Sequence, residues 1–100
     1  MKIDLDKALF YSNHGSEYAS NGEYDKAINA LSSAIKHNPK DSNLYVVRGH
    51  IFSDKGECDK AITDYNQAIM LESDNSEAFY LRGKEYIKKG EADIEESGLK

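Results

Sequence analysis

The side chains best suited to chemistry are Cys58, the only cysteine in the chain, and His50, which precedes it. A thiol beside an imidazole could serve as a nucleophile with its base. One helix N-terminus is the only feature that would lower the thiol pKa, and Asp59 opposes it. Because Cys58 also falls on an apolar helix stripe, we interpret it as a packed thiol and keep a thiol enzyme as the weaker alternative.

No other group of residues has the spacing of a catalytic, metal or cofactor site. The three histidines, His14, His37 and His50, lack ligand spacing. The acidic residues do not form a calcium-binding loop. Gly83 and Lys84 lack the upstream glycine of a phosphate-binding loop. The sequence therefore predicts a protein that is not an enzyme and that needs no cofactor and no metal.

Length and charge narrow the class of protein. The chain has 100 residues, which we expect to form one domain over residues 1–100, and its formal net charge is −5. An acidic surface is unsuited to phosphate, so we expect no nucleic-acid partner. No apolar run approaches the roughly 18 residues of a membrane span, so we expect no membrane partner. A single cysteine fits a reducing compartment, and we expect the cytoplasm.

The main sign of organisation is an internal repeat. Aligning residues 8–41 with 42–75 gives ten identities in 34 positions, where roughly two would arise by chance. Aligning 42–66 with 76–100 gives seven identities in 25 positions. Apolar residues in each full copy follow the i, i+3, i+4, i+7 spacing of one helix face. These stripes are Tyr24, Ala27, Ile28, Leu31, Ala34 and Ile35, and then Cys58, Ala61, Ile62, Tyr65, Ala68 and Ile69.

Six glycines recur with the repeat and predict two different roles. One set separates helical patterns, where a turn needs a residue free to take positive φ. The other set falls inside helical patterns, where each glycine costs about 1 kcal/mol relative to alanine. The close approach of a second helix, which carries Ala27 or Ala61, is the expected reason for that cost. The turn set is Gly22, Gly56 and Gly90, and the helix set is Gly15, Gly49 and Gly83.

Each unit is therefore expected to be a helix, a tight turn and a second, antiparallel helix. Pro39 ends the second helix of the chain. Asp41 and Asn75 are the expected N-caps of the third and fifth helices. The expected helices span residues 7–21, 24–37, 42–55, 58–72 and 76–89.

Spaced residues in both full units carry a recognisable pattern. They are Tyr11, Gly15, Tyr18, Ala27, Leu31, Ala34 and Pro39 in the first unit, and Tyr45, Gly49, Phe52, Ala61, Tyr65 and Ala68 in the second. This pattern resembles that of the tetratricopeptide repeat (TPR) family, whose period of about 34 residues is the same. The resemblance covers about residues 8–91. The chain departs from the pattern at His14, Arg48 and Arg82, which replace leucine, at Ser73, which replaces proline, and at Cys58, which replaces an aromatic residue.

The resemblance implies an all-α fold, a right-handed solenoid of antiparallel helix pairs with about two and a half repeats. The units would be residues 8–41 and 42–75, with a partial unit at 76–100. It also implies a concave groove, lined by the first helix of each unit, that holds an extended peptide or a partner's helix.

The groove positions miss the core stripes, so we expect them to be exposed. Val46, Val47, Tyr80 and Leu81 would then form an exposed apolar cluster of the kind that marks binding sites. The alternative is that these residues bury against the neighbouring unit. The predicted groove residues are Asn13, Ser16, Val46, Val47, His50, Tyr80, Leu81, Lys84 and Lys88.

The predicted function is protein–protein interaction without catalysis, with another protein or a peptide as partner. The alternative is a structural assembly or oligomerisation module whose groove is unused. One subset of the family binds the acidic C-terminal tails of heat-shock chaperones through a clamp of lysine, asparagine and arginine side chains. The positions of that clamp hold no cationic residue here, so we expect no specific binding of such tails. Those positions are Ser12, Ser16, Val47, Glu77 and Leu81.

The third unit lacks the apolar stripe of a second helix. Glu95 and Glu96 fall where Ala61 and Ile62 stand in the unit before, and Gly98 would interrupt a helix. We therefore expect residues 92–100 to be loosely held.

The helix expected at 76–89 would then end the solenoid. Arg82, Glu85 and Lys89 follow helical spacing and are expected to face water together. Tyr86 is expected to be partly open, because its counterparts in the other units belong to the core pattern. A weak homodimer through this C-terminal end follows as a further expectation.

Overall fold

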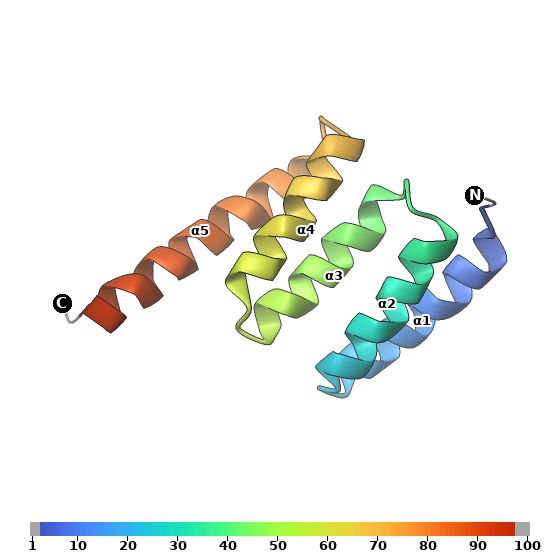
Figure 1. The fold of residues 1–100 in the computed structure, drawn as a ribbon, viewed down its shortest axis with the longest axis horizontal. Coiled ribbons are helices and arrows are strands. Elements are labelled where there is room, and N and C mark those ends of the chain that lie inside the picture. Colours follow the sequence, from blue (N-terminus) through green and yellow to red (C-terminus); the bar gives the residue numbers. More distant parts are fainter. Residues whose placement is uncertain (1–2, 98–100) are drawn as a thin grey trace.

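The computed structural model shows five α-helices that follow one another side by side (Figure 1). It describes the backbone of residues 3–97 and the side chains of residues 3–91. The first four helices lie within two residues of the expected ranges, and no strand occurs within residues 3–97. The all-α fold class is therefore confirmed. The helices are α1 (Leu5–Ser20), α2 (Tyr24–His37), α3 (Ser42–Asp54), α4 (Cys58–Leu71) and α5 (Ser76–Ser97).

The order of packing follows the order of the chain. Helix α1 packs on α2, α3 packs on α4, and α2 joins the two pairs through α3. Helix α5 packs on α4 and also reaches α3. Figure 1 shows α5 at one end of the row and α1 with α2 at the other. Helix α5 therefore lies close to α3 as well as to α4, so α3 and α5 can line a common binding surface.

Two of the three turn glycines adopt the conformation that the repeat predicts. Gly22 has φ +77° and Gly56 has φ +88°, in the left-handed region that side chains disfavour. The same prediction is wrong for Gly90, because α5 continues through this residue as far as Ser97. The chain therefore does not turn at Gly90 as it does at Gly22 and Gly56.

The expected caps are confirmed at both positions. The Asp41 carboxylate accepts a hydrogen bond from the Asn43 amide at 3.0 Å, at the start of α3. The Asn75 side-chain oxygen accepts from the Ala78 amide at 3.0 Å, at the start of α5. Each bond satisfies one of the free amides of a helix N-terminus.

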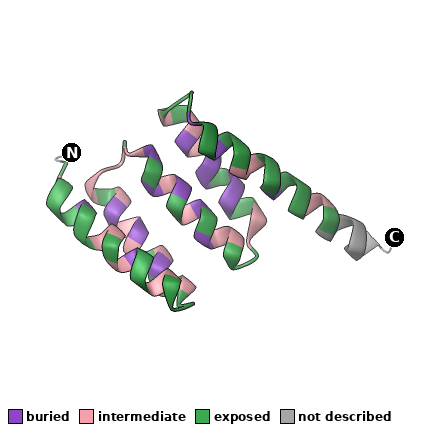
Figure 2. Ribbon diagram, turned by 180° about the vertical axis from the view of Figure 1, so that it is seen from behind, coloured by how far each residue is buried: buried purple, intermediate pink, exposed green. Residues whose placement is uncertain are grey.

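The core consists of the repeated apolar stripes. Ala27, Leu31 and Ala34 of α2 are fully buried and pack with the buried Leu44 and Ile51 of α3. A second cluster is formed by Val46, Ala68 and Ala78, which come from α3, α4 and α5. Figure 2 shows the buried residues on the sides where helices face each other and exposed residues on the outer sides.

The glycines inside helices confirm the expected close approach in the first two units. An added Cβ on Gly15 would lie 2.9 Å from Leu31 Cγ. An added Cβ on Gly49 would lie 2.7 Å from the Tyr65 ring and 3.2 Å from the Ala61 carbonyl oxygen. At Gly83 nothing lies within 4 Å, so close approach is not the role of this glycine within the described chain.

The C-terminal end differs from the expected one in its secondary structure. Residues 92–97 extend α5 in place of forming a separate segment. Their side chains, and the whole of residues 98–100, including Gly98, lie outside the described residues, as does the expectation that this segment is loosely held. Over the part of the chain that is described, no helix combines the length and the apolar character needed to cross a membrane.

Candidate functional site

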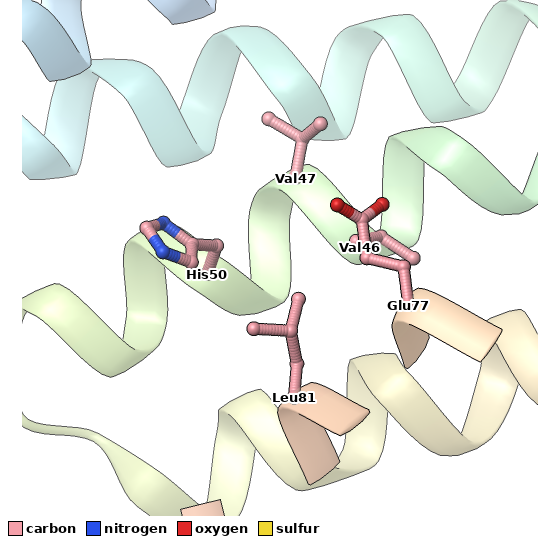
Figure 3. A pocket seen from close by; sticks show the side chains of 5 residues that line it. All are labelled: Val46, Val47, His50, Glu77 and Leu81. Atoms are coloured by element: carbon pink, nitrogen blue, oxygen red, sulfur yellow. The ribbon is translucent and has the colours of Figure 1, made fainter. Parts of the chain in front are cut away.

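A hollow lies between α3 and α5 on the side where the groove was expected. It has a volume of about 280 Å³ and is lined by Val46, Val47 and His50 from α3 and by Glu77 and Leu81 from α5. Figure 3 shows the Glu77 and Leu81 side chains extending from α5 toward α3. Four of the nine predicted groove residues therefore meet at one place.

Val46 lies at the floor of this hollow and not on its rim. Only 4% of the residue is exposed, because it packs against Ala68 of α4 and Ala78 of α5. The prediction that Val46 belongs to an exposed apolar cluster is therefore wrong, and the alternative of burial against the neighbouring unit holds at this position. Val47 is exposed, and Leu81 is half-buried beside the same cluster.

A second hollow continues from the first toward the C-terminal end of α3. The two share His50 and Leu81, so they form one surface, which we call the α3–α5 groove. The second part has a volume of about 160 Å³ and brings in Lys84 and Lys88, as predicted. Its remaining lining residues are Ser53, Asp54, Tyr65 and Glu85.

Glu85 is the main correction within this groove. The residue was expected to face water with Arg82 and Lys89, but only 2% of it is exposed. Its Oε2 atom accepts no hydrogen bond from the described residues, and the Lys88 ammonium lies 3.8 Å from it. The repeat gave conflicting signals for this position, because Glu85 aligns both with Ile51, which is buried, and with Glu17, which is exposed.

Lys88 closes one end of the groove. Its Nζ donates to the Ser53 hydroxyl at 2.8 Å and to the Ser53 carbonyl at 3.3 Å. These bonds hold α5 against the end of α3. The Lys88 ammonium is therefore partly committed to the protein itself, whereas Lys84 lies over the Tyr80 ring at 5.4 Å.

Two titratable groups near Glu85, Cys58 and Tyr65, have a raised pKa. The neighbouring Glu85 carboxylate raises the pKa of the Cys58 thiol, and burial raises it further. Burial, with a smaller contribution from Glu85, also raises the pKa of Tyr65. A raised pKa is the opposite of what activates a nucleophilic thiol. His50 lies beside Asp54, with His50 Nδ1 at 3.6 Å from the carboxylate.

Three predicted groove residues lie outside the α3–α5 groove. Asn13 and Ser16 are exposed on α1, and Tyr80 is 65% exposed on α5 without lining either hollow. A separate hollow of about 210 Å³ lies between α1 and the start of α3, and it includes neither Asn13 nor Ser16. The unit-one end of the predicted site is therefore not brought together with the rest.

Arg48, on α3 beside Val47, links this helix to both α4 and α2. Its guanidinium donates two hydrogen bonds to the buried Asp64 carboxylate on α4, at 2.7 and 2.8 Å. A third bond reaches the Ser32 hydroxyl on α2 at 3.1 Å. An arginine where the repeat pattern has leucine gave no reason to expect this link. The only feature of the sequence that pointed to this ion pair was the acidic residue Asp64, which lies next to the apolar stripe of α4.

Comparison with protein families gives one result for this chain. A family model described as TPR repeat matches residues 15–53 and 49–90. No curated protein matches the chain.

Solved structures of similar fold include three that are informative. The chain is similar to the first TPR domain of Spaghetti (RPAP3), bound to the HSP90 peptide SRMEEVD, with a TM-score of 0.83 and 25% identity over 87% of this chain and 69% of that chain. It is similar to MamA with a TM-score of 0.81 and 30% identity, covering 96% of this chain and 56% of that chain. The present chain thus spans little more than half of MamA. The Sgt2 TPR domain from Aspergillus fumigatus, with a TM-score of 0.82 and 20% identity over 90% of this chain and 59% of that chain, shares the fold.

Proposed function

Since the chain belongs to the tetratricopeptide repeat family, whose model matches most of its length, we propose that it binds a peptide segment of another protein in the α3–α5 groove. The observation that most supports this proposal is the hollow between α3 and α5. It lies between helices of two successive units and combines Val47 and Leu81 with polar side chains at its edges. Sites of this kind, apolar with a few placed polar groups, are typical of ligand binding.

The chemistry of the groove favours a peptide with an apolar anchor beside an acidic residue. The Val47 and Leu81 side chains provide apolar surface for the anchor, and the buried Val46 lies at the base of the hollow. Lys84 and Lys88 lie along the second part of the groove and provide positive charge on an acidic protein. The anchor is expected to supply most of the affinity, because an exposed charge pair contributes only up to about 1 kcal/mol.

Chaperone tails are not the proposed ligand. The first TPR domain of Spaghetti binds the HSP90 peptide SRMEEVD, a strongly acidic sequence. In the α3–α5 groove the corresponding positions include Glu77, which would repel such a peptide, and Val47 and Leu81, which cannot hold a carboxylate. We therefore expect the present chain to bind a different peptide class.

The test is a selection of random peptides displayed on phage with the native protein as bait. Peptides retained by the wild type are then measured against Val47→Ser, Leu81→Ala and Lys84→Ala by calorimetry. We expect Val47→Ser or Leu81→Ala to weaken binding by about 2 kcal/mol or more, which is roughly 30-fold, and Lys84→Ala by about 1 kcal/mol at most. The peptide SRMEEVD serves as the negative probe and should show no micromolar affinity.

The matched control is Met70→Ala, which shortens an exposed apolar residue outside the groove. This variant should bind the selected peptides as the wild type does. If all three groove variants bind them unchanged, the groove assignment is wrong. If SRMEEVD binds at micromolar concentration, the exclusion of chaperone tails is wrong. Circular dichroism on each variant separates a loss of binding from a loss of fold, which matters most for the half-buried Leu81.

We take residues 1–100 as one TPR-like domain that acts through binding and not through catalysis. The free thiol of Cys58 supports a reducing compartment such as the cytoplasm.

A further inference from the structure

The outer face of α5 carries large apolar side chains that nothing in the described chain covers. Phe79 is 44% exposed, Tyr80 65%, Tyr86 52% and Ile87 65%. Figure 2 shows exposed residues along this helix. At about 100° per residue the four lie in two pairs, Phe79 with Tyr86 and Tyr80 with Ile87, on either side of a line of small residues. That line consists of Ser76, Gly83 and Gly90, spaced by seven.

The first two units show what normally covers this face. Gly15 and Gly49 occupy the same repeat position as Gly83 and lie against a second helix, through Leu31 and Tyr65 respectively. A Cβ added at Gly83 would meet no atom of the described chain within 4 Å. Gly83 therefore lies at the centre of a helix-docking position whose helix is absent from the described residues.

The described continuation of the chain does not supply that helix. Helix α5 runs straight through Gly90 to Ser97, so residues 91–97 lead away from Gly83 and do not fold back over it. The third unit thus differs from the first two in its packing. Its large side chains remain in contact with water, which favours association through this face.

We propose that a second copy of this chain covers the face, with two α5 helices packed antiparallel about a two-fold axis at Gly83. The sequence of the helix is complementary to itself in this arrangement. Gly83 meets Gly83, and Gly90 lies opposite Ser76, so the backbones can approach closely. Phe79 of each copy then lies near Tyr86 of the other, and Tyr80 lies near Ile87. A two-fold pair is also the commonest closed arrangement of identical chains.

The charges of α5 agree with an antiparallel pair. The dipoles of the two helices oppose each other, which is favourable. Glu91 arrives beside the N-terminal turn of the other α5, near Ser76, where the helix carries partial positive charge. A parallel pair would place Glu91 beside the C-terminal part of the other helix and lose this interaction.

The area of the face sets the strength of the association. Large apolar side chains present about 200 Å² each. Four of them, each about half exposed, would remove about 400 Å² per copy and about 800 Å² in the pair. Stable interfaces bury at least about 1,200 Å², so the dimer is expected to be weak and transient.

The test uses the fact that a residue on a two-fold axis meets itself. Sedimentation equilibrium of the wild type from micromolar to millimolar concentration should show a rise from monomer to dimer. Gly83→Glu and Gly83→Lys each place two like charges at the axis and should weaken association at least tenfold. An equimolar mixture of the two variants should associate more strongly than either variant alone, because opposite charges then meet, but less strongly than the wild type, because the new side chains hold the two backbones apart.

The matched controls are Asn29→Glu and Asn29→Lys, which make the same charge changes at an exposed position of α2. They should associate as the wild type does. The proposal is overturned by a wild type that stays monomeric at millimolar concentration, by Gly83 variants that associate as the wild type does, or by a mixture that associates no more strongly than either variant alone. Peptide binding in the α3–α5 groove should be unchanged in the Gly83 variants, so the outcome does not depend on the groove assignment.

Discussion

The repeat glycine inside the first helix of each unit allows one substitution to be made in two environments. At Gly49 a new methyl group would lie 2.7 and 3.0 Å from atoms of the Tyr65 ring, which is almost fully buried, and 3.2 Å from the Ala61 carbonyl oxygen. Neither group can move freely. At Gly83 the same methyl group would meet no described atom within 4 Å. Gly49→Ala should therefore destabilise the protein and Gly83→Ala should stabilise it.

The magnitude follows from two opposing effects. Alanine gains about 1 kcal/mol over glycine in a helix interior at both positions. Overpacking a rigid site costs about 1–3 kcal/mol, and this cost arises only at Gly49. The gain in helix propensity cancels when the two variants are compared. We therefore expect the free energy of unfolding of Gly83→Ala to exceed that of Gly49→Ala by about 1–3 kcal/mol.

Denaturant unfolding followed by circular dichroism at micromolar protein concentration measures this difference in the monomer. For a domain of this size the melting temperatures should differ by at least about 4 °C. Gly15→Ala should fall between the two, because its close contact is the Leu31 side chain and its distance to backbone is longer, at 3.4 Å. Equal changes for Gly49→Ala and Gly83→Ala would refute the packing explanation.

Two further predictions concern the buried polar groups. Arg48→Met should lower the free energy of unfolding by about 3 kcal/mol, because it leaves the Asp64 carboxylate buried without its partner. The double variant with Asp64→Leu should recover much of the lost stability in denaturant unfolding. A single variant that is no less stable than the double variant would contradict this explanation. Cys58 should react with a thiol probe more slowly at neutral pH than a free thiol does, because the neighbouring Glu85 carboxylate raises the pKa of its thiol. The rate should therefore continue to rise with pH above the usual thiol pKa. Glu85→Gln should speed the reaction at fixed pH because it removes that carboxylate, and an unchanged rate in this variant would contradict the assigned cause.

The repeat period was sufficient to predict the order of the helices and, to within two residues, the bounds of the first four. Helix ends at Gly22 and Gly56 and the cap at Asp41 depend on local backbone chemistry, which the sequence shows directly. Close approach at Gly15 and Gly49 also followed from the repeat, since three equal costs at one spacing required a common cause. These features agree because local preference and tertiary packing favour the same structure.

The depth of individual groove residues could not be predicted in the same way. An apolar stripe in the sequence shows which side of a helix faces the core, but it does not show how closely the helices of the next unit approach that helix. Val46 is buried because the small residues Ala68 and Ala78 allow α4 and α5 to come close to α3. Glu85 is buried because α5 turns that side toward α4, although glutamate is among the residues least often buried. Its counterparts in the repeat disagree, since Ile51 is buried and Glu17 is exposed, so the repeat alone could not decide the burial of Glu85.

The end of the solenoid shows why a repeated glycine does not determine a turn on its own. Glycine permits positive φ but also permits a helix, at a cost of about 1 kcal/mol. At Gly22 and Gly56 the turn brings the next apolar stripe onto the preceding helix, and that burial greatly exceeds the cost of ordering the turn. After Gly90 the stripe is interrupted, because Glu95 and Glu96 occupy two of its central positions. Folding back would bury charge and gain little apolar contact. The helix therefore continues, and the face around Gly83 is left for another chain to cover.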